Sequence, residues 1–432
     1  MISISNIQNV DDFFPNLNVT LGYYDPHFQV IQINNIDLSR YDHLMNLIAT
    51  LSSESSLHSL TDLSVLAHEL THFIDHLSTL WGQRYLISTF NAIHSITENS
   101  PYKYDYISVF YREALNIGLK SEHDLQTQGV MDSQIRGCKA FIIDPCELDP
   151  MIGKPIISIQ YFSGSIVSPV RRSPISILSM LETRAVCAEY MYFSFLVNQI
   201  YGDKECFDED SLVQNLIQRM EQLGFLEYSN VSWYLQARYQ IFDPIQLYIM
   251  TSILSWITLN FPNSLFSQIV VPGDWDISSS KYLEAMLDAN DRGLIFYLLC
   301  IAGIDCDYKD LDSWISSLLH KLSLPSYSKI MNLARQEMDS LQDMILSGPE
   351  CERLQALLEI GYSNFGSVQR EGIPFLVQNP SSYSRPMIKL SDGIQFYPYN
   401  SPNILDDTDW FTRAESYFSQ LDSTIGDYFG VK

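Results

Sequence analysis

Eight residues in the first fifth of the chain, Val65-Leu66-Ala67-His68-Glu69-Leu70-Thr71-His72, constrain its fold more than any other stretch. They belong to an apolar segment that is predicted to form a helix over residues 60–81. Ser59-Leu60-Thr61-Asp62 has the pattern of a capping box at the start of this helix, and Gly82 suits a left-handed cap at its end. Histidines four residues apart on a helix point the same way, so the spacing predicts two ligands for one metal ion.

The H-E-x-x-H pattern also assigns a role to Glu69. This residue follows the first histidine directly, so its carboxylate can reach a water activated by Zn²⁺ without occupying a coordination position. The flanking residues are apolar, and two imidazoles and a carboxylate would be costly to bury there without a purpose. We therefore predict one zinc ion per chain, bound by His68 and His72, with Glu69 as general base. The alternative is a chance match in an ordinary helix.

The stretch Ala67–His72 resembles the active-site helix of the zincin metallopeptidases, and its sequence is most similar to that of the thermolysin-like gluzincins. The resemblance covers the motif helix and a fragment of a later helix. It implies a zincin-like catalytic core and a third zinc ligand, a glutamate on a later helix, commonly in an E-x-x-[small] context. A metzincin arrangement is not expected, because position 75 is Asp75 rather than glycine and position 78 is Ser78 rather than histidine.

The best match for the third ligand is Glu182, in Glu182-Thr183-Arg184-Ala185 on a helix predicted over 174–199. This segment resembles the E-x-x-A of several gluzincin groups, and the small Ala185 allows close packing against the motif helix. The family often has an acid or amide four residues after the ligand, and Val186 departs from that pattern. Glu189 shares a face with Glu182, so it is the alternative third ligand or a carboxylate that supports the zinc site.

Two polar residues continue the motif helix beyond His72. His76 is eight residues from His68, about 12 Å along a helix, so both cannot bind the same ion. We expect His76 to be an exposed helix histidine, with support of a ligand as the alternative. Asp75 is predicted either to orient a ligand imidazole or to face solvent.

The composition argues against several partners. Lys and Arg number 26 against 51 Asp and Glu, which gives a formal net charge of −25. Nucleic acids and anionic membranes attract basic surfaces, so neither is an expected partner. The seven cysteines include no C-x-x-C pair, which favours reduced thiols. No Lys or Arg precedes Arg40 and no long apolar run follows Met1, so we expect a cytoplasmic protein without a leader. The charge-free stretch Pro244–Gly273 is interpreted as a buried helix rather than a membrane span.

The expected fold class is α+β, mostly helical, with a small N-terminal sheet. Residues 1–205 are predicted to form the zincin-like domain and residues 206–432 a mainly helical domain for partner recognition or access control. Strands are expected at 18–24, 27–33, 139–143, 156–162, 165–167, 387–390 and 394–397, and further helices at 40–52, 83–96, 209–223, 278–303, 309–322, 326–346, 350–362 and 408–426.

Substrate contacts are less well defined by the sequence. Ile156–Val167 or His27–Ile33 could provide an edge strand that receives an extended peptide. Arg171-Arg172, just before the Glu182 helix, is expected in a solvated loop, with a substrate contact as the alternative.

Together these features predict a zinc-dependent endopeptidase that acts on a specific protein or peptide substrate, in a regulatory, toxin-like or defence role. A regulatory protein partner is a further expectation. The alternatives are a non-enzymatic helical interaction protein, with a structural metal or none, and a metal hydrolase acting on something other than peptides.

Overall fold

The computed structural model is mostly helical and, in the residues that it describes, contains two small sheets, which confirms the mostly helical α+β class. It describes residues 22–34, 36–50, 57–117, 135–143, 155–163, 171–201, 226–241, 243–275, 277, 280–303, 310–348, 350–371, 386–396 and 409–429. Among these residues, no helix is both long enough and apolar enough to cross a membrane.

The first sheet combines strands from both ends of the chain. Its order is β1 (Gly22–Asp25), β2 (Val30–Ile33), β6 (Met387–Lys389) and β7 (Gln395–Phe396), with β2 and β6 parallel and the other pairs antiparallel. The Asp25 carboxylate closes the β1–β2 turn by accepting hydrogen bonds from the backbone N–H groups of His27 and Phe28, at 2.9 and 3.0 Å. The predicted N-terminal sheet is therefore completed by C-terminal strands.

The second sheet is an antiparallel set in the order β3 (Ile135–Ile143), β4 (Ile156–Ser163) and β5 (Arg171–Pro174). β4 lies at its centre, as β2 does in the first sheet, so neither strand offers the free edge that peptide addition needs. The prediction that either strand lies at a sheet edge is wrong. Arg171 and Arg172 belong to β5 rather than to a loop, and residues 165–167 lie outside the described part.

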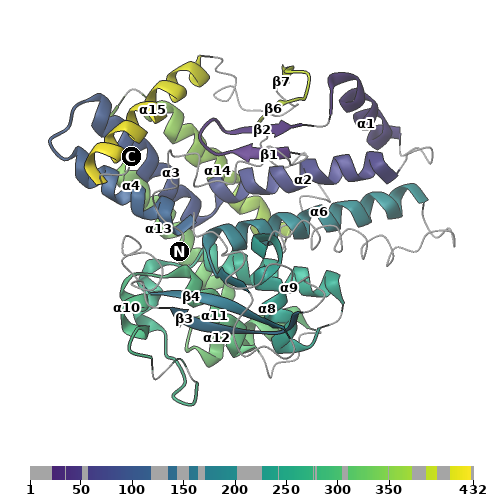
Figure 1. Cartoon of the computed structure of the whole chain (residues 1–432), viewed down its shortest axis with the longest axis vertical. Helices are drawn as coiled ribbons and strands as arrows, with labels where there is room; N and C mark the ends of the chain where they lie inside the picture. Colours follow the sequence, from purple (N-terminus) through teal and green to yellow (C-terminus); the bar gives the residue numbers. More distant parts are fainter. Residues whose placement is uncertain are drawn as a thin grey trace.

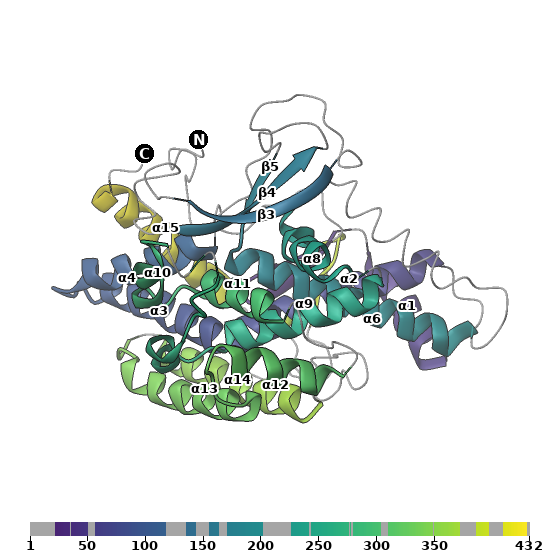
Figure 2. The ribbon, with the colours of Figure 1, turned by 90° about the horizontal axis from the view of Figure 1, so that it is seen from below.

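Two long helices lie side by side across the middle of the molecule, α2 (Leu57–Ser78) and α6 (Ile177–Tyr201) (Figure 1). β1 packs on α2 from one side, and α8 and α9 pack on α6 from the other. Helices α12, α13 and α14 form a layer at one side of the molecule in the second view (Figure 2). The other helices are α1 (Leu38–Thr50), α3 (Leu80–Thr97), α4 (Lys103–Ile117), α8 (Leu226–Tyr239), α9 (Pro244–Leu259), α10 (Leu283–Asp288), α11 (Arg292–Ala302), α12 (Leu311–Lys321), α13 (Tyr327–Leu341), α14 (Cys351–Glu371) and α15 (Trp410–Phe429), with short 3₁₀ turns η4 (Asn263–Gln268) and η6 (Gln342–Met344).

The ends of α2 differ from their prediction. The helix already includes Leu57, so Ser59 lies inside it rather than at its cap. At the other end α2 stops at Ser78, and Gly82 lies in the first turn of α3, where its N–H donates to the Thr79 hydroxyl at 3.0 Å. A Cβ at Gly82 would overlap the carbonyl oxygen of His76, so glycine is needed for the tight corner between the helices rather than for a left-handed cap.

Other predicted elements mostly agree in position. The helix expected at 278–303 is divided into α10 and α11, because Asn290 has a positive φ of 52° and the Asp291 carboxylate caps α11 by accepting from Leu294 N–H. The charge-free stretch contains α9, which starts at an Asp243 cap followed by Pro244 and is largely buried, as predicted. The helix expected at 209–223 lies outside the described residues.

One hydrophobic cluster includes residues from both predicted domains, among them Phe73, Leu181, Leu254 and Leu357. The expected boundary near 202–210 is outside the described residues, so the division at 205 stays a prediction.

The contact between α14 and α2 gives a first test of this packing. A Cβ at Gly361 of α14 would overlap the Leu77 carbonyl oxygen of α2. We predict that Gly361→Ala lowers the free energy of unfolding by about 1–3 kcal/mol, although alanine is the better helix former. Gly273→Ala is the control, because a Cβ there meets nothing within 4 Å. Urea unfolding of both variants measures the difference, and a Gly361→Ala variant as stable as the native chain would contradict the packing.

Candidate metal centre

Three side chains from α2 and α6 meet in a compact group. His68 Nε2 lies 3.2 Å from His72 Nε2, and each of these nitrogens lies 3.4 Å from Glu182 Oε2. Within the described part of the chain, these residues form the one group of His, Cys, Asp and Glu side chains that could hold a metal ion. Ligands on a tetrahedral Zn²⁺ at about 2.0–2.1 Å are themselves about 3.3 Å apart, so the three atoms have the separations of three corners of such a site.

The other ring nitrogen of His68, Nδ1, contacts Glu189, the residue predicted as the alternative third ligand. Nδ1 of His68 donates to Glu189 Oε2 at 3.1 Å, and Ser64 Oγ donates to Glu189 Oε1 at 3.3 Å. Glu189 therefore contacts the side of the ring away from Glu182. A proton on Nδ1 leaves a lone pair on Nε2, which is the form of histidine that binds metals.

This arrangement places several hydrogen-bond acceptors together in a buried site. The side chains of His68, His72 and Glu182 are 8%, 14% and 5% exposed. The ring nitrogens of His68 and His72, each 3.4 Å away, are the close polar partners of Glu182 Oε2 among the described residues. Buried lone pairs that face each other need a cation or a proton between them. His72, the most exposed of the three, is the side chain closest to solvent.

The pKa values of His68 and Glu182 are shifted in the directions that keep positive charge in the site and the carboxylate ionised. Burial alone would lower the pKa of His68, but its hydrogen bonds to Glu182 and Glu189 outweigh this and raise the pKa well above its usual value. Burial would raise the pKa of Glu182, yet the charges and hydrogen bonds of His72 and His68 lower it to about 2. Glu182 is thus ionised at neutral pH, as a metal ligand must be.

Glu69 is buried beside this group and is not one of its three members. Burial raises the pKa of its carboxyl group, while the nearby histidines His68 and His72 oppose the rise. A carboxylate with a raised pKa is a better proton acceptor than an exposed one, which suits a general base.

A buried ion pair joins α2 to α6 near the candidate metal-binding group. Arg184 donates from Nε and Nη2 to the two oxygens of Asp75, at 2.6 and 2.8 Å, and both side chains are at most 1% exposed. The guanidinium also donates to the Ser252 carbonyl at 3.3 Å and lies 4.7 Å from the ring centre of Trp256 on α9. Asp75 therefore neither faces solvent nor orients an imidazole of the candidate ligands: it joins the two helices that carry them.

The prediction that His76 is exposed is wrong. His76 is 4% exposed, and its Nδ1 forms a hydrogen bond of 2.9 Å with the Tyr24 hydroxyl from β1. Burial lowers the pKa of His76 to about 3, with a smaller contribution from His27. His76 is therefore a neutral core residue between the sheet and α3.

No protein-family model, no curated protein and no solved structure matches this chain. The resemblance to the zincins therefore depends on the motif helix and the Glu182 segment, and the roles of the residues must be argued from their own geometry.

The Asp75–Arg184 pair generates a stability prediction. Asp75→Leu leaves a buried guanidinium without its counter-ion and should lower the free energy of unfolding by about 3–5 kcal/mol. Adding Arg184→Met removes the unpaired charge and should recover most of the loss, which urea unfolding at a fixed zinc concentration would measure. A cost below about 1 kcal/mol for the single variant would show that the pair does not hold the helices together.

The buried, neutral state of His76 should make the stability of the chain depend on pH. Its pKa is about 3 in the folded chain and about 6.5 when unfolded, so between these values the unfolded state binds more protons and stability falls as pH falls. From pH 7 to pH 5, His76→Gln should lose about 2 kcal/mol less stability than the native chain. His320→Gln, at an exposed histidine, is the control. Equal losses in the native and His76→Gln chains, measured by urea unfolding, would contradict a buried neutral ring.

Proposed function

We propose that this protein is a zinc-dependent endopeptidase that hydrolyses peptide bonds of a protein substrate. The observation that carries the proposal is the convergence of His68 Nε2, His72 Nε2 and Glu182 Oε2, at 3.2–3.4 Å, beside the buried Glu69. Separations of this size suit a tetrahedral zinc site with three protein ligands and one open position, as in catalytic rather than structural zinc sites.

In this proposal, His68, His72 and Glu182 hold the ion. Zn²⁺ when bound would supply a Lewis acid that makes a water molecule acidic and polarises a substrate carbonyl. Glu189, supported by Ser64, keeps the proton of His68 on Nδ1 and fixes the orientation of the ring. The Asp75–Arg184 pair holds α6 at the register in which Glu182 reaches both histidines.

Glu69 is the residue that moves the proton. Its carboxylate accepts a proton from the attacking water and then donates it to the leaving amine, so that one side chain serves both halves of peptide hydrolysis. Its burial raises its pKa, which brings the proton affinity closer to what both transfers need. The two histidines of α2 and the general base between them thus account for the complete H-E-x-x-H pattern.

The test uses Glu69→Gln, which keeps the shape of the side chain and removes its ability to accept a proton. We predict a loss of proteolytic activity of about 100-fold or more with unchanged zinc content. The native protein and the variant are incubated with a proteome, and new N-termini are counted by mass spectrometry. Glu359→Gln, at an exposed position on α14, is the matched control and should retain full activity.

The outcomes separate the alternatives. Equal cleavage by Glu69→Gln would remove the general base from the mechanism. Zinc binding by the native protein without any cleavage would favour a metal hydrolase acting on another substrate. Absence of both zinc and cleavage would favour a non-enzymatic interaction protein.

A further inference from the structure

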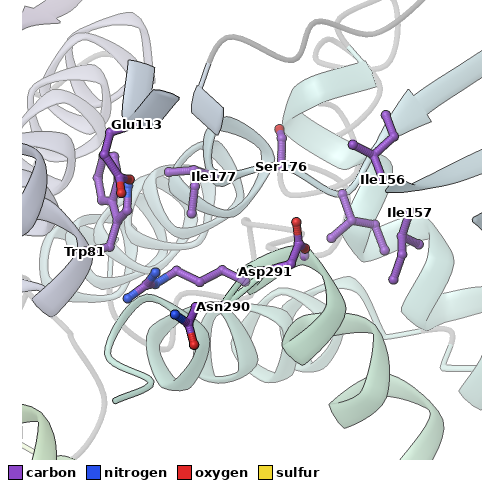
Figure 3. A pocket seen from close by; sticks show the side chains of 11 residues that line it. Trp81, Glu113, Ile156, Ile157, Ser176, Ile177, Asn290 and Asp291 are labelled. Carbon is purple, nitrogen blue, oxygen red and sulfur yellow. The ribbon is translucent and has the colours of Figure 1, made fainter. Parts of the chain in front are cut away.

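A second polar site lies at the start of α6, apart from the metal-binding group. It is a partly enclosed cavity of about 30 Å³, lined by Trp81 of α3, Glu113 of α4, Ile177 of α6, and Asp291 and Arg292 at the start of α11, together with neighbouring residues (Figure 3). Ile177 is five residues before Glu182, about 7.5 Å along the helix. An occupant of the cavity would therefore contact the same helix that carries the third proposed ligand.

Arg292 brings an unused pair of hydrogen-bond donors to this cavity. Its Nε and Nη2 atoms are buried, and neither has an acceptor among the described residues. These two N–H groups form the edge of the guanidinium that matches the two oxygens of a carboxylate. The same chain shows how this edge is used, since Arg184 donates from the same two atoms to the carboxylate of Asp75.

Trp81 adds a third donor. Its side chain is 1% exposed, it lines the cavity, and its indole Nε1 also has no acceptor in the described part of the chain. Indole nitrogen can only donate, so it pairs with an acceptor or stays unsatisfied. Three buried N–H donors from two separate helices thus line one small cavity.

The surrounding charges indicate what kind of acceptor fits. Burial lowers the pKa of the Arg292 guanidinium, and the charges of Glu113 and Asp291 oppose this. Asp291 uses its carboxylate to cap α11, at 2.9 Å from Leu294 N, and the nearby Arg84 is paired with Glu337. With two acidic residues in the lining, a singly charged planar group fits better than a doubly charged phosphate. The cavity volume is also close to that of one or two water molecules, enough for a carboxylate head.

We propose that this cavity binds a carboxylate group, with Arg292 Nε and Nη2 donating to its two oxygens and Trp81 Nε1 donating a third hydrogen bond. The carboxylate belongs to a small organic acid or to the C-terminus of a peptide, which present the same chemistry. Carboxylate binding in this cavity does not require zinc, so its test is independent of the test of the proposed peptidase activity.

The test follows the indole N–H signal of Trp81 by NMR, assigned by its loss in Trp81→Phe. Sodium acetate should shift this signal in a saturable way, whereas acetamide, with the same shape and no charge, should not. Arg292→Gln should weaken acetate binding at least tenfold, and Arg335→Gln, at an exposed arginine, should leave it unchanged. Thermal unfolding of Arg292→Gln checks that this variant is folded.

Two further probes identify the source of the carboxylate. N-acetylglycine imitates a peptide C-terminus, and its amide is the matched control. Binding of N-acetylglycine at least as tight as acetate identifies a peptide C-terminus, and binding of acetate alone identifies a small acid; both support the site.

Three results would overturn the proposal. One is an Arg292→Gln variant that still binds acetate as tightly as the native chain. Another is an equal shift with acetamide or sodium chloride. The third is absence of acetate binding in the native chain; its appearance in Glu113→Gln would then show that Glu113 itself occupies the guanidinium edge.

Discussion

The structure depends on the contact between α2 and α6, where Asp75 and Arg184 meet although they are 109 residues apart in sequence. The buried bidentate pair of Asp75 and Arg184 fixes this contact at one point, and Trp256 and Ser252 of α9 enclose the guanidinium. Close packing of α14 and the α3 corner against the end of α2 leaves little freedom for that helix to shift. Because the histidines lie on one helix and Glu182 on the other, this single alignment decides whether the three side chains meet.

The chemistry of the group follows from the way its protons are arranged. Glu189 keeps the proton of His68 on the nitrogen that faces away from Glu182, so the opposite nitrogen presents its lone pair to the other acceptors. In a buried site such a set of lone pairs is unfavourable without positive charge. Protonation of His68, whose pKa is raised, supplies positive charge to the site, and a divalent cation would also supply it. The proposed metal ion would supply this charge at the centre of the group.

Much of the fold and of the candidate site could be predicted from the sequence wherever the pattern that indicates it is local. The histidine spacing and the E-x-x-A context identified the residues that the structure brings together, and the absence of charge over 244–273 identified α9 as buried. The errors concern distant contacts. Asp75 and His76 have polar character but are buried, because their partners Arg184 and Tyr24 come from other elements that no local pattern reveals. The Arg292 cavity was missed for the same reason. A useful signal was present nonetheless: in a chain with only 18% charged residues, Arg292 directly precedes an apolar run, where an arginine is a candidate for a buried polar site.

The central claim is that His68, His72 and Glu182 hold one zinc ion, and elemental mass spectrometry of protein purified without added metal tests it most directly. The account predicts close to one zinc per chain in the native protein and loss of that zinc in His72→Ala and Glu182→Ala variants that stay folded. Glu359→Gln should keep its zinc. A native protein that contains no zinc and binds none on titration would contradict the account, and so would a Glu182→Ala variant that binds zinc as tightly as the native chain.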